Sequence, residues 1–160
     1  MIEKTLLISH RGNTTGPSPD YENNPAYVNK TLSMGYDVEI DVWMSRSELY
    51  LGHDSPDYKV NIDFLKRPGL WCHAKSLEAL SLMVSNNIHC FWHNTDDYTL
   101  TSQGKIWSSP DSIISENCIW VMPEKSKQFI ERKIVSIQCI GVCSDIVKII
   151  ESEIDNRRAS

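Results

Sequence analysis

The sequence has few of the features that mark membrane-bound, secreted or nucleic-acid-binding proteins. No apolar run approaches the roughly 20 residues of a membrane span, and the first run, residues 6–8, is too short and wrongly flanked for a signal peptide. Acidic residues outnumber Lys and Arg by 21 to 16, and no basic run is denser than Arg157-Arg158, which disfavours binding to a polyphosphate backbone. We therefore expect a cytoplasmic protein with no membrane span and no nucleic-acid partner.

The cysteines lack the paired CxxC spacing of a zinc site built on sulfur. Their number is odd, and each lies in an apolar run where a reduced thiol packs as a small hydrophobic group. Disulfide staples are also unnecessary, because a chain of 160 residues can bury about two thirds of the surface that its extended form exposes. We expect one domain over residues 1–160 with buried thiols at Cys72, Cys90, Cys118, Cys139 and Cys143.

Short apolar runs alternate with helical patterns along the whole chain, which is typical of an α/β fold. Strands are expected at residues 6–9, 37–44, 48–52, 70–74, 88–93, 105–108, 118–122 and 139–143. Helices are expected after Asn24, at 62–66, after Ser76, at 111–115, at 126–133 and around 146–154. The count predicts about seven parallel strands plus a hairpin strand after the second one. Such a sheet either closes as a small barrel or stays open and doubly wound.

Polar side chains gather at the predicted carboxyl ends of these strands, where parallel α/β proteins bind ligands. His10 ends the first strand, and His53 follows the hairpin strand. Glu39 and Asp41 lie two residues apart, so they project from the same face of the second strand. Burying two adjacent carboxylates without a partner would cost several kcal/mol, so their spacing favours a bound divalent cation. The alternative is a pair of exposed acids on an edge strand.

Further candidates follow the later strands. His73 and Lys75 share a face at the end of the 70–74 strand, whereas His89 begins its strand and is expected to be structural. His93 and Asn94 lie in a segment, residues 91–101, that is rich in aromatic and hydrogen-bonding side chains. Such a loop suits a sugar or polyol, and a capped turn is the alternative.

Four of these pieces together resemble a known family. They are HRG at residues 10–12, YENNPAY with Glu22 and Asn23, VEIDVW with Glu39 and Asp41, and LYLGHD with His53. In order and spacing they are similar to the glycerophosphodiester phosphodiesterase family, within the phospholipase C-like phosphodiesterases. The resemblance covers the first 55 residues closely, and residues 70–75 and 140–145 more loosely. It implies a TIM-type βα barrel.

The resemblance also implies roles for individual residues. His10 and His53 would be the general acid and base, and Arg11 and Lys75 would bind the phosphate. Glu39, Asp41, Glu22 and His73 would form the metal site, with Mg²⁺ or Ca²⁺ as the metal. His93, Asn94 and Glu124 are further candidates for substrate binding.

Two departures from the family qualify this interpretation. His73 stands where the family has a glutamate, and an imidazole favours Mn²⁺ or Zn²⁺ over Ca²⁺. The chain is also shorter than the ~200 residues of the smallest TIM barrels, so we expect a reduced barrel. An open side would expose apolar strand edge and favour a homodimer.

The function expected from the sequence is a metal-dependent phosphodiesterase that hydrolyses a small glycerophosphodiester-like, sugar or polyol phosphodiester. The alternative is a non-catalytic phosphate- or polyol-binding module derived from the same fold, which the short length and His73 favour. A metal-dependent phosphomonoesterase with the same residues is a third hypothesis.

Overall fold

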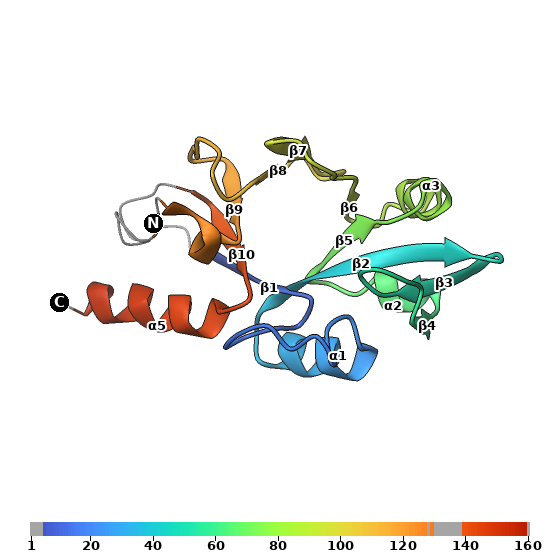
Figure 1. Cartoon of the computed structure of the whole chain (residues 1–160), viewed down its shortest axis with the longest axis horizontal. Helices are drawn as coiled ribbons and strands as arrows, with labels where there is room; N and C mark the ends of the chain where they lie inside the picture. Colours follow the sequence, from blue (N-terminus) through green and yellow to red (C-terminus); the bar gives the residue numbers. More distant parts are fainter. Residues whose placement is uncertain (1–4, 128, 130–138, 160) are drawn as a thin grey trace.

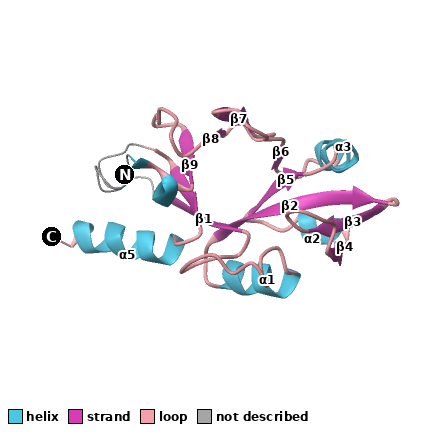
Figure 2. Cartoon of the chain, in the orientation of Figure 1, coloured by secondary structure: helices cyan, strands magenta, loops and turns pink. Residues whose placement is uncertain are grey.

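The structure is a computed structural model that describes residues 5–127, 129 and 139–159. It contains one mixed sheet that curls on itself, with helices on its outer side (Figures 1 and 2). The strands are β1 (Leu6–His10), β2 (Asp37–Ser45), β3 (Glu48–Leu51), β4 (Tyr58–Val60), β5 (Leu70–Ala74), β6 (Cys90–Phe91), β7 (Tyr98–Leu100), β8 (Ile106–Ser108), β9 (Cys118–Val121) and β10 (Gly141–Ser144). The helices are α1 (Pro25–Ser33), α2 (Ile62–Leu65), α3 (Leu77–Ser85), the 3₁₀ turn η1 (Pro123–Lys125) and α5 (Val147–Arg158). No helix in the described part of the chain is long and apolar enough to cross a membrane.

Parallel pairing dominates the sheet. The neighbours β1–β2, β1–β10, β2–β5, β5–β6, β9–β10 and β8–β9 pair in parallel. The pairs β2–β3, β3–β4 and β7–β8 are antiparallel. The predicted hairpin after the second strand is therefore confirmed, while β4 and β7 are additional antiparallel strands that the sequence did not predict. Among the described residues no strand pairing joins β6 to β7 or β8, so the structure supports a curled α/β sheet rather than a complete parallel barrel.

Two kinds of core lie on opposite sides of the sheet. The outer side packs against α1 and α3 through a cluster that includes Val28, Ile40 and Met83, all fully buried. The inner, concave side is filled by large apolar residues, among them Trp71, Phe91 and Trp107. Because side chains alternate along a strand, the positions beyond this aromatic layer on the same side are His10, Glu39 and Asp41, His73 and His93. The candidate site thus rests on an apolar floor.

Local sequence explains how the helices begin. The side chain of Asn24 accepts hydrogen bonds from the amides of Ala26 and Tyr27, with Pro25 in the first helical position. Ser76 caps α3 by accepting from the amide of Ala79. Both helix starts are as predicted.

Other expectations are wrong. Residues 111–115 form a turn and an irregular segment rather than a helix. The spacing of Leu77, Leu80 and Val84 predicts that they share the inner face of α3, but Leu77 and Val84 are 72% and 55% exposed; Leu80 is partly buried against the core, and the fully buried residues are Ala79 and Met83. The expected helix 126–133 lies largely outside the described residues. Of the five cysteines, Cys139 is only partly buried and the other four are buried.

Gly141 gives a stability test of the central β1–β10 pairing, in which it lies opposite Leu6. A methyl group at Gly141 would lie 2.6 Å from Leu6 Cβ and 2.7 Å from the Leu6 carbonyl oxygen. We expect Gly141→Ala to lower the free energy of unfolding in urea by about 1–3 kcal/mol. Amide hydrogen exchange should accelerate along β1 and β10.

The control is Gly104→Ala, where an added methyl group meets nothing within 4 Å and the positive φ strains only the turn before β8. Exchange in β1 and β10 should stay at the wild-type rate in this control. Wild-type stability in Gly141→Ala would contradict the packing of these two strands.

Candidate functional site

The strand register brings the predicted acidic pair and two histidines together at the carboxyl ends of the parallel strands. His10 at the end of β1 lies opposite Glu39 of β2, and Asp41 lies opposite His73 of β5. His53 follows β3, which runs antiparallel to β2 and returns the chain toward Asp41. Residues that are up to 63 positions apart in the sequence therefore meet at the carboxyl ends of parallel strands.

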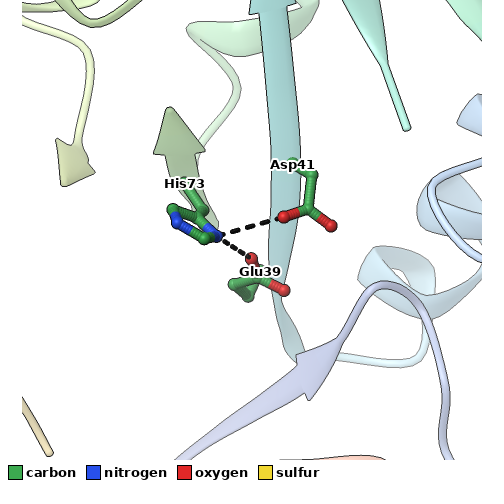
Figure 3. Close-up of side chains that lie close together, drawn as sticks. All are labelled: Glu39, Asp41 and His73. Atoms are coloured by element: carbon green, nitrogen blue, oxygen red, sulfur yellow. Dashed lines mark hydrogen bonds and ion pairs between the residues drawn. The ribbon is translucent and has the colours of Figure 1, made fainter. Parts of the chain in front are cut away.

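Glu39, Asp41 and His73 form a compact cluster with the donor set of a metal site (Figure 3). One ligand atom from each residue lies within 4.8 Å of the others. His73 Nδ1 is 3.1 Å from Asp41 Oδ1 and 3.8 Å from Glu39 Oε1. Both carboxyl groups are almost completely buried, and Glu39 Oε2 has no hydrogen-bond partner in the described part of the chain. An orphaned buried oxygen beside a second carboxylate fits a cation.

The ring of His73 adds an independent argument for a cation. Its Nε2 lies 3.0 Å from the carbonyl oxygen of His93, and a carbonyl can only accept, so Nε2 carries a proton. In the neutral ring Nδ1 then has a lone pair, and that lone pair points at the carboxylate oxygens of Asp41 and Glu39. A second ring proton or a metal ion makes this arrangement favourable, and in metal-free protein the proton of a neutral Glu39 carboxyl group reduces the repulsion.

Asp41 is the most heavily contacted of the charged groups. Its Oδ2 lies 3.0 Å from Arg11 Nε and 3.4 Å from His53 Nδ1, while Lys75 Nζ lies 3.9 Å from Oδ1. Asn23 donates to Oδ2 and accepts from the Asp41 amide, both at 2.9 Å. Burial raises the pKa of Asp41, but contacts with His53, His73 and the Arg11 guanidinium outweigh it and hold that pKa well below its usual range.

Glu39 lies in the opposite electrostatic situation. Burial, together with the nearby charge of Asp41, raises the pKa of its carboxyl group well above the usual range, and the charges of Arg11 and Lys75 only partly compensate. The pair therefore combines one firmly ionised carboxylate with one that needs a further positive charge in order to ionise. A metal ion at the cluster would supply that charge.

Arg11 connects the loop after β1 to this site. It donates from Nη1 to Glu22 Oε2 at 3.1 Å, and its Nη2 lies 2.6 Å from His53 Nδ1. Glu22 therefore binds Arg11 and Asn13. It was predicted as a metal ligand, but it lies outside the cluster of Glu39, Asp41 and His73. Both Arg11 and Asn23 have a positive φ, 56° and 63°, a conformation that costs energy in residues other than glycine and is common at functional sites.

His10 has a partner that the sequence reasoning did not select. Its Nδ1 lies 2.7 Å from Asp145 Oδ1, and the same oxygen accepts from Asn13 Nδ2 at 2.8 Å. The Asp145 amide in turn donates to Glu124 Oε1 at 2.9 Å. Asp145 follows β10, and the parallel pairing of β10 with β1 is what places it beside His10. The GVCSD segment contained this signal, because its last residue is a carboxylate at a strand end.

The remaining candidates are less closely engaged. The His93 carbonyl binds His73, while its own Nδ1 is buried without a partner among the described residues. Burial, followed by the charge of His73, lowers the pKa of His93. Glu124 holds the Asp145 amide, and its Oε2 is likewise buried and unpartnered. Asn94 is exposed and forms no hydrogen bond or ion pair with the cluster in the described part of the chain, and the neighbouring Trp92 is 47% exposed.

Comparisons with known proteins give no further identification: no family model, no curated protein and no solved structure matches the chain.

Because the two carboxyl groups lie in different environments, replacing each by its neutral amide should affect the stability of the metal-free protein differently. Asp41→Asn leaves the buried Arg11 guanidinium with one carboxylate fewer, so we expect the free energy of unfolding to fall by about 3 kcal/mol. Glu39→Gln resembles the protonated carboxyl group that burial already favours, so its stability should lie within about 1 kcal/mol of the wild type or above it. Urea unfolding in the presence of a chelator measures both, and equal losses would contradict the assigned charge states.

Proposed function

We propose that the chain is a metal-dependent phosphodiesterase of the glycerophosphodiester phosphodiesterase type. Its substrate would be a small glycerophosphodiester-like, sugar or polyol phosphodiester, and its fold a reduced form of the TIM-type barrel. The observation that carries this proposal is the presence of two imidazoles beside the buried acidic pair, His10 next to Glu39 and His53 next to Asp41. The two imidazoles flank the Glu39–Asp41–His73 cluster.

His10 has the environment of a general base. The Asp145 carboxylate accepts from Nδ1–H, so in the neutral ring Nε2 carries the lone pair. This nitrogen lies on the side of Glu39, 3.9 Å from Oε2. There it would take the proton of the attacking hydroxyl, which belongs to water or to a neighbouring group of the substrate. Asp145 would stabilise the imidazolium that results.

His53 has the environment of a general acid. In its protonated form, the imidazolium, the ring would donate from Nδ1 to Asp41 Oδ2, which lies 3.4 Å away, and would carry its second proton on Nε2. The ring is 42% exposed, which lets Nε2–H reach a substrate oxygen. It would protonate the leaving oxygen as the bond to phosphorus breaks, which balances the proton taken up by His10.

Two cationic side chains beside the cluster, Arg11 and Lys75, would bind the phosphate. Arg11 and Lys75 both lie beside Asp41, and the planar guanidinium suits the two non-bridging oxygens of a phosphodiester. Glu39, Asp41 and His73 would hold a divalent cation, Mn²⁺ or Zn²⁺ by their donor set, with Mg²⁺ or Ca²⁺ as the family resemblance implies. When bound, the cation would act as a Lewis acid that stabilises negative charge on the phosphoryl oxygens.

The catalytic test uses two substrates that differ only in their leaving group, glycerophosphocholine and the p-nitrophenyl ester of glycerol 3-phosphate. His10→Ala should lower kcat about 10²–10⁴-fold on both, because both need the base. His53→Ala should cause a similar loss on the alkyl ester but a much smaller one on the p-nitrophenyl ester, whose leaving oxygen needs no proton. Asp145→Asn should weaken the base and lower both rates.

Circular dichroism and thermal unfolding serve as the folding controls for these variants. Hydrolysis of glycerophosphocholine that persists at the wild-type rate in His10→Ala or His53→Ala would refute the assignment. Calorimetry that detects phosphodiester binding without turnover under every divalent metal would instead favour the non-catalytic binding module.

The identity of residue 73 predicts the metal preference. Wild-type protein should be stabilised against thermal unfolding more by Mn²⁺ or Zn²⁺ than by Mg²⁺ or Ca²⁺, because Nδ1 of His73 is a borderline-soft ligand. His73→Glu restores an anionic oxygen and should shift the preference toward Mg²⁺ and Ca²⁺. His89→Gln, a histidine away from the cluster, is the control and should keep the wild-type order. Stabilisation of the wild type by Ca²⁺ or Mg²⁺ alone would contradict the role of His73.

A further inference from the structure

We propose that the chain binds a small phosphate-bearing anion in a second cavity, at the end of the sheet opposite to the candidate active site. The cavity has a volume of about 320 Å³, at the lower end of the range for small-molecule sites. This inference is independent of the proposed function, since it concerns none of the residues assigned to catalysis or to the metal.

The position of the cavity follows from the parallel strands. It is lined by Asp37 and Trp71, from the first residues of β2 and β5, and by His89 and Lys105, which precede β6 and β8. These are amino ends of strands, whereas His10, Asp41 and His73 lie at carboxyl ends. The aromatic layer of the inner core lies between the two sites.

The charge of the cavity contrasts with that of the whole chain. Three cationic side chains, Lys66, Arg67 and Lys105, line it together with a single carboxylate, Asp37, in a protein whose net charge is −5. A basic recess in an acidic protein concentrates anions locally. The surplus of positive charge matches a phosphate dianion.

Two of these cations are free to bind a ligand. The Arg67 guanidinium is already engaged, because it donates to Asn29 Oδ1 and lies 5.5 Å from the centre of the Phe64 ring. Lys66 and Lys105 are exposed and form no ion pair with a carboxylate in the described part of the chain. They are therefore the groups expected to contact the anion.

The wall of the cavity supplies neutral hydrogen-bonding groups. The His89 ring packs on Trp71 with centroids 4.2 Å apart, and its Nε2 lies 2.9 Å from Thr101 Oγ1. Burial, together with the charge of Lys105, lowers the pKa of His89 to about 4, so the ring is neutral at pH 7. Trp71 Nε1 donates to Asp37 Oδ2 at 2.9 Å, which fixes the one carboxylate against the wall and makes the indole N–H a reporter of the cavity.

The test is a titration of protein labelled with ¹⁵N in its tryptophan side chains, with inorganic phosphate as the probe at constant ionic strength. We expect a saturable shift of the Trp71 indole signal. Lys105→Met should weaken phosphate binding about three- to tenfold, and Asp37→Asn should strengthen it by a similar factor, because the amide still accepts from Trp71 but carries no charge. Lys30→Met, an exposed lysine on α1, is the matched control and should not change the affinity.

Trp43 separates this site from the candidate active site, because its indole N–H donates to the Gly52 carbonyl next to His53. A shift of Trp43 without one of Trp71 would place phosphate at the active-site end, which would overturn the second site but not the proposed function. No Trp71 shift at 20-fold molar excess and above, or weaker binding in Asp37→Asn, would also overturn it. Because Asp37→Asn is expected to gain affinity, a loss of folding cannot imitate the expected result.

Discussion

The buried charge of Asp41 is the constraint on which the rest of the candidate site depends. A carboxylate with no exposed surface is tolerated only when it is paired and hydrogen-bonded. Asp41 meets this requirement with groups from three separate segments: Arg11 and Asn23 from the loop after β1, His53 from the β3 return, and His73 from β5. The same contacts therefore stabilise Asp41 and bring the candidate site residues together.

The three histidines of the site differ in whether their hydrogen-bond partners donate or accept. The Asp145 carboxylate accepts from His10, the His93 carbonyl accepts from His73, and His53 lies between the Arg11 guanidinium and the Asp41 carboxylate. In the neutral rings these contacts leave a lone pair on Nε2 of His10 and on Nδ1 of His73. Three histidines in one site thus present different chemistry toward the acidic pair, without any difference in residue type.

Local patterns predicted those features that depend on neighbouring residues. Asn24 and Pro25 mark the start of α1, and the two-residue spacing of Glu39 and Asp41 places both carboxyl groups on one face of β2. The partner of His10 was missed because Asp145 is 135 residues away, and only the β1–β10 pairing brings the two together. The face of α3 was predicted only in part, because Leu77 is as apolar as a core residue but is 72% exposed, whereas Leu80 packs against the core. Such outcomes depend on tertiary structure, which periodicity does not encode.

The aromatic layer inside the curled sheet accounts for the coexistence of two differently charged ends. Phe91 stacks on His73 with an interplanar angle of 2° at one boundary of this layer, and Trp71 packs on His89 at the other. Between them Trp107 contacts both Trp71 and Phe91, with ring centroids 5.8 Å and 4.6 Å apart. Large apolar rings keep water out, so each end retains its own field: carboxylates that require cations at the carboxyl ends, and lysines without partners at the amino ends. A substitution that let water into this layer would therefore weaken the electrostatic interactions at both ends, although it would replace none of the charged residues there.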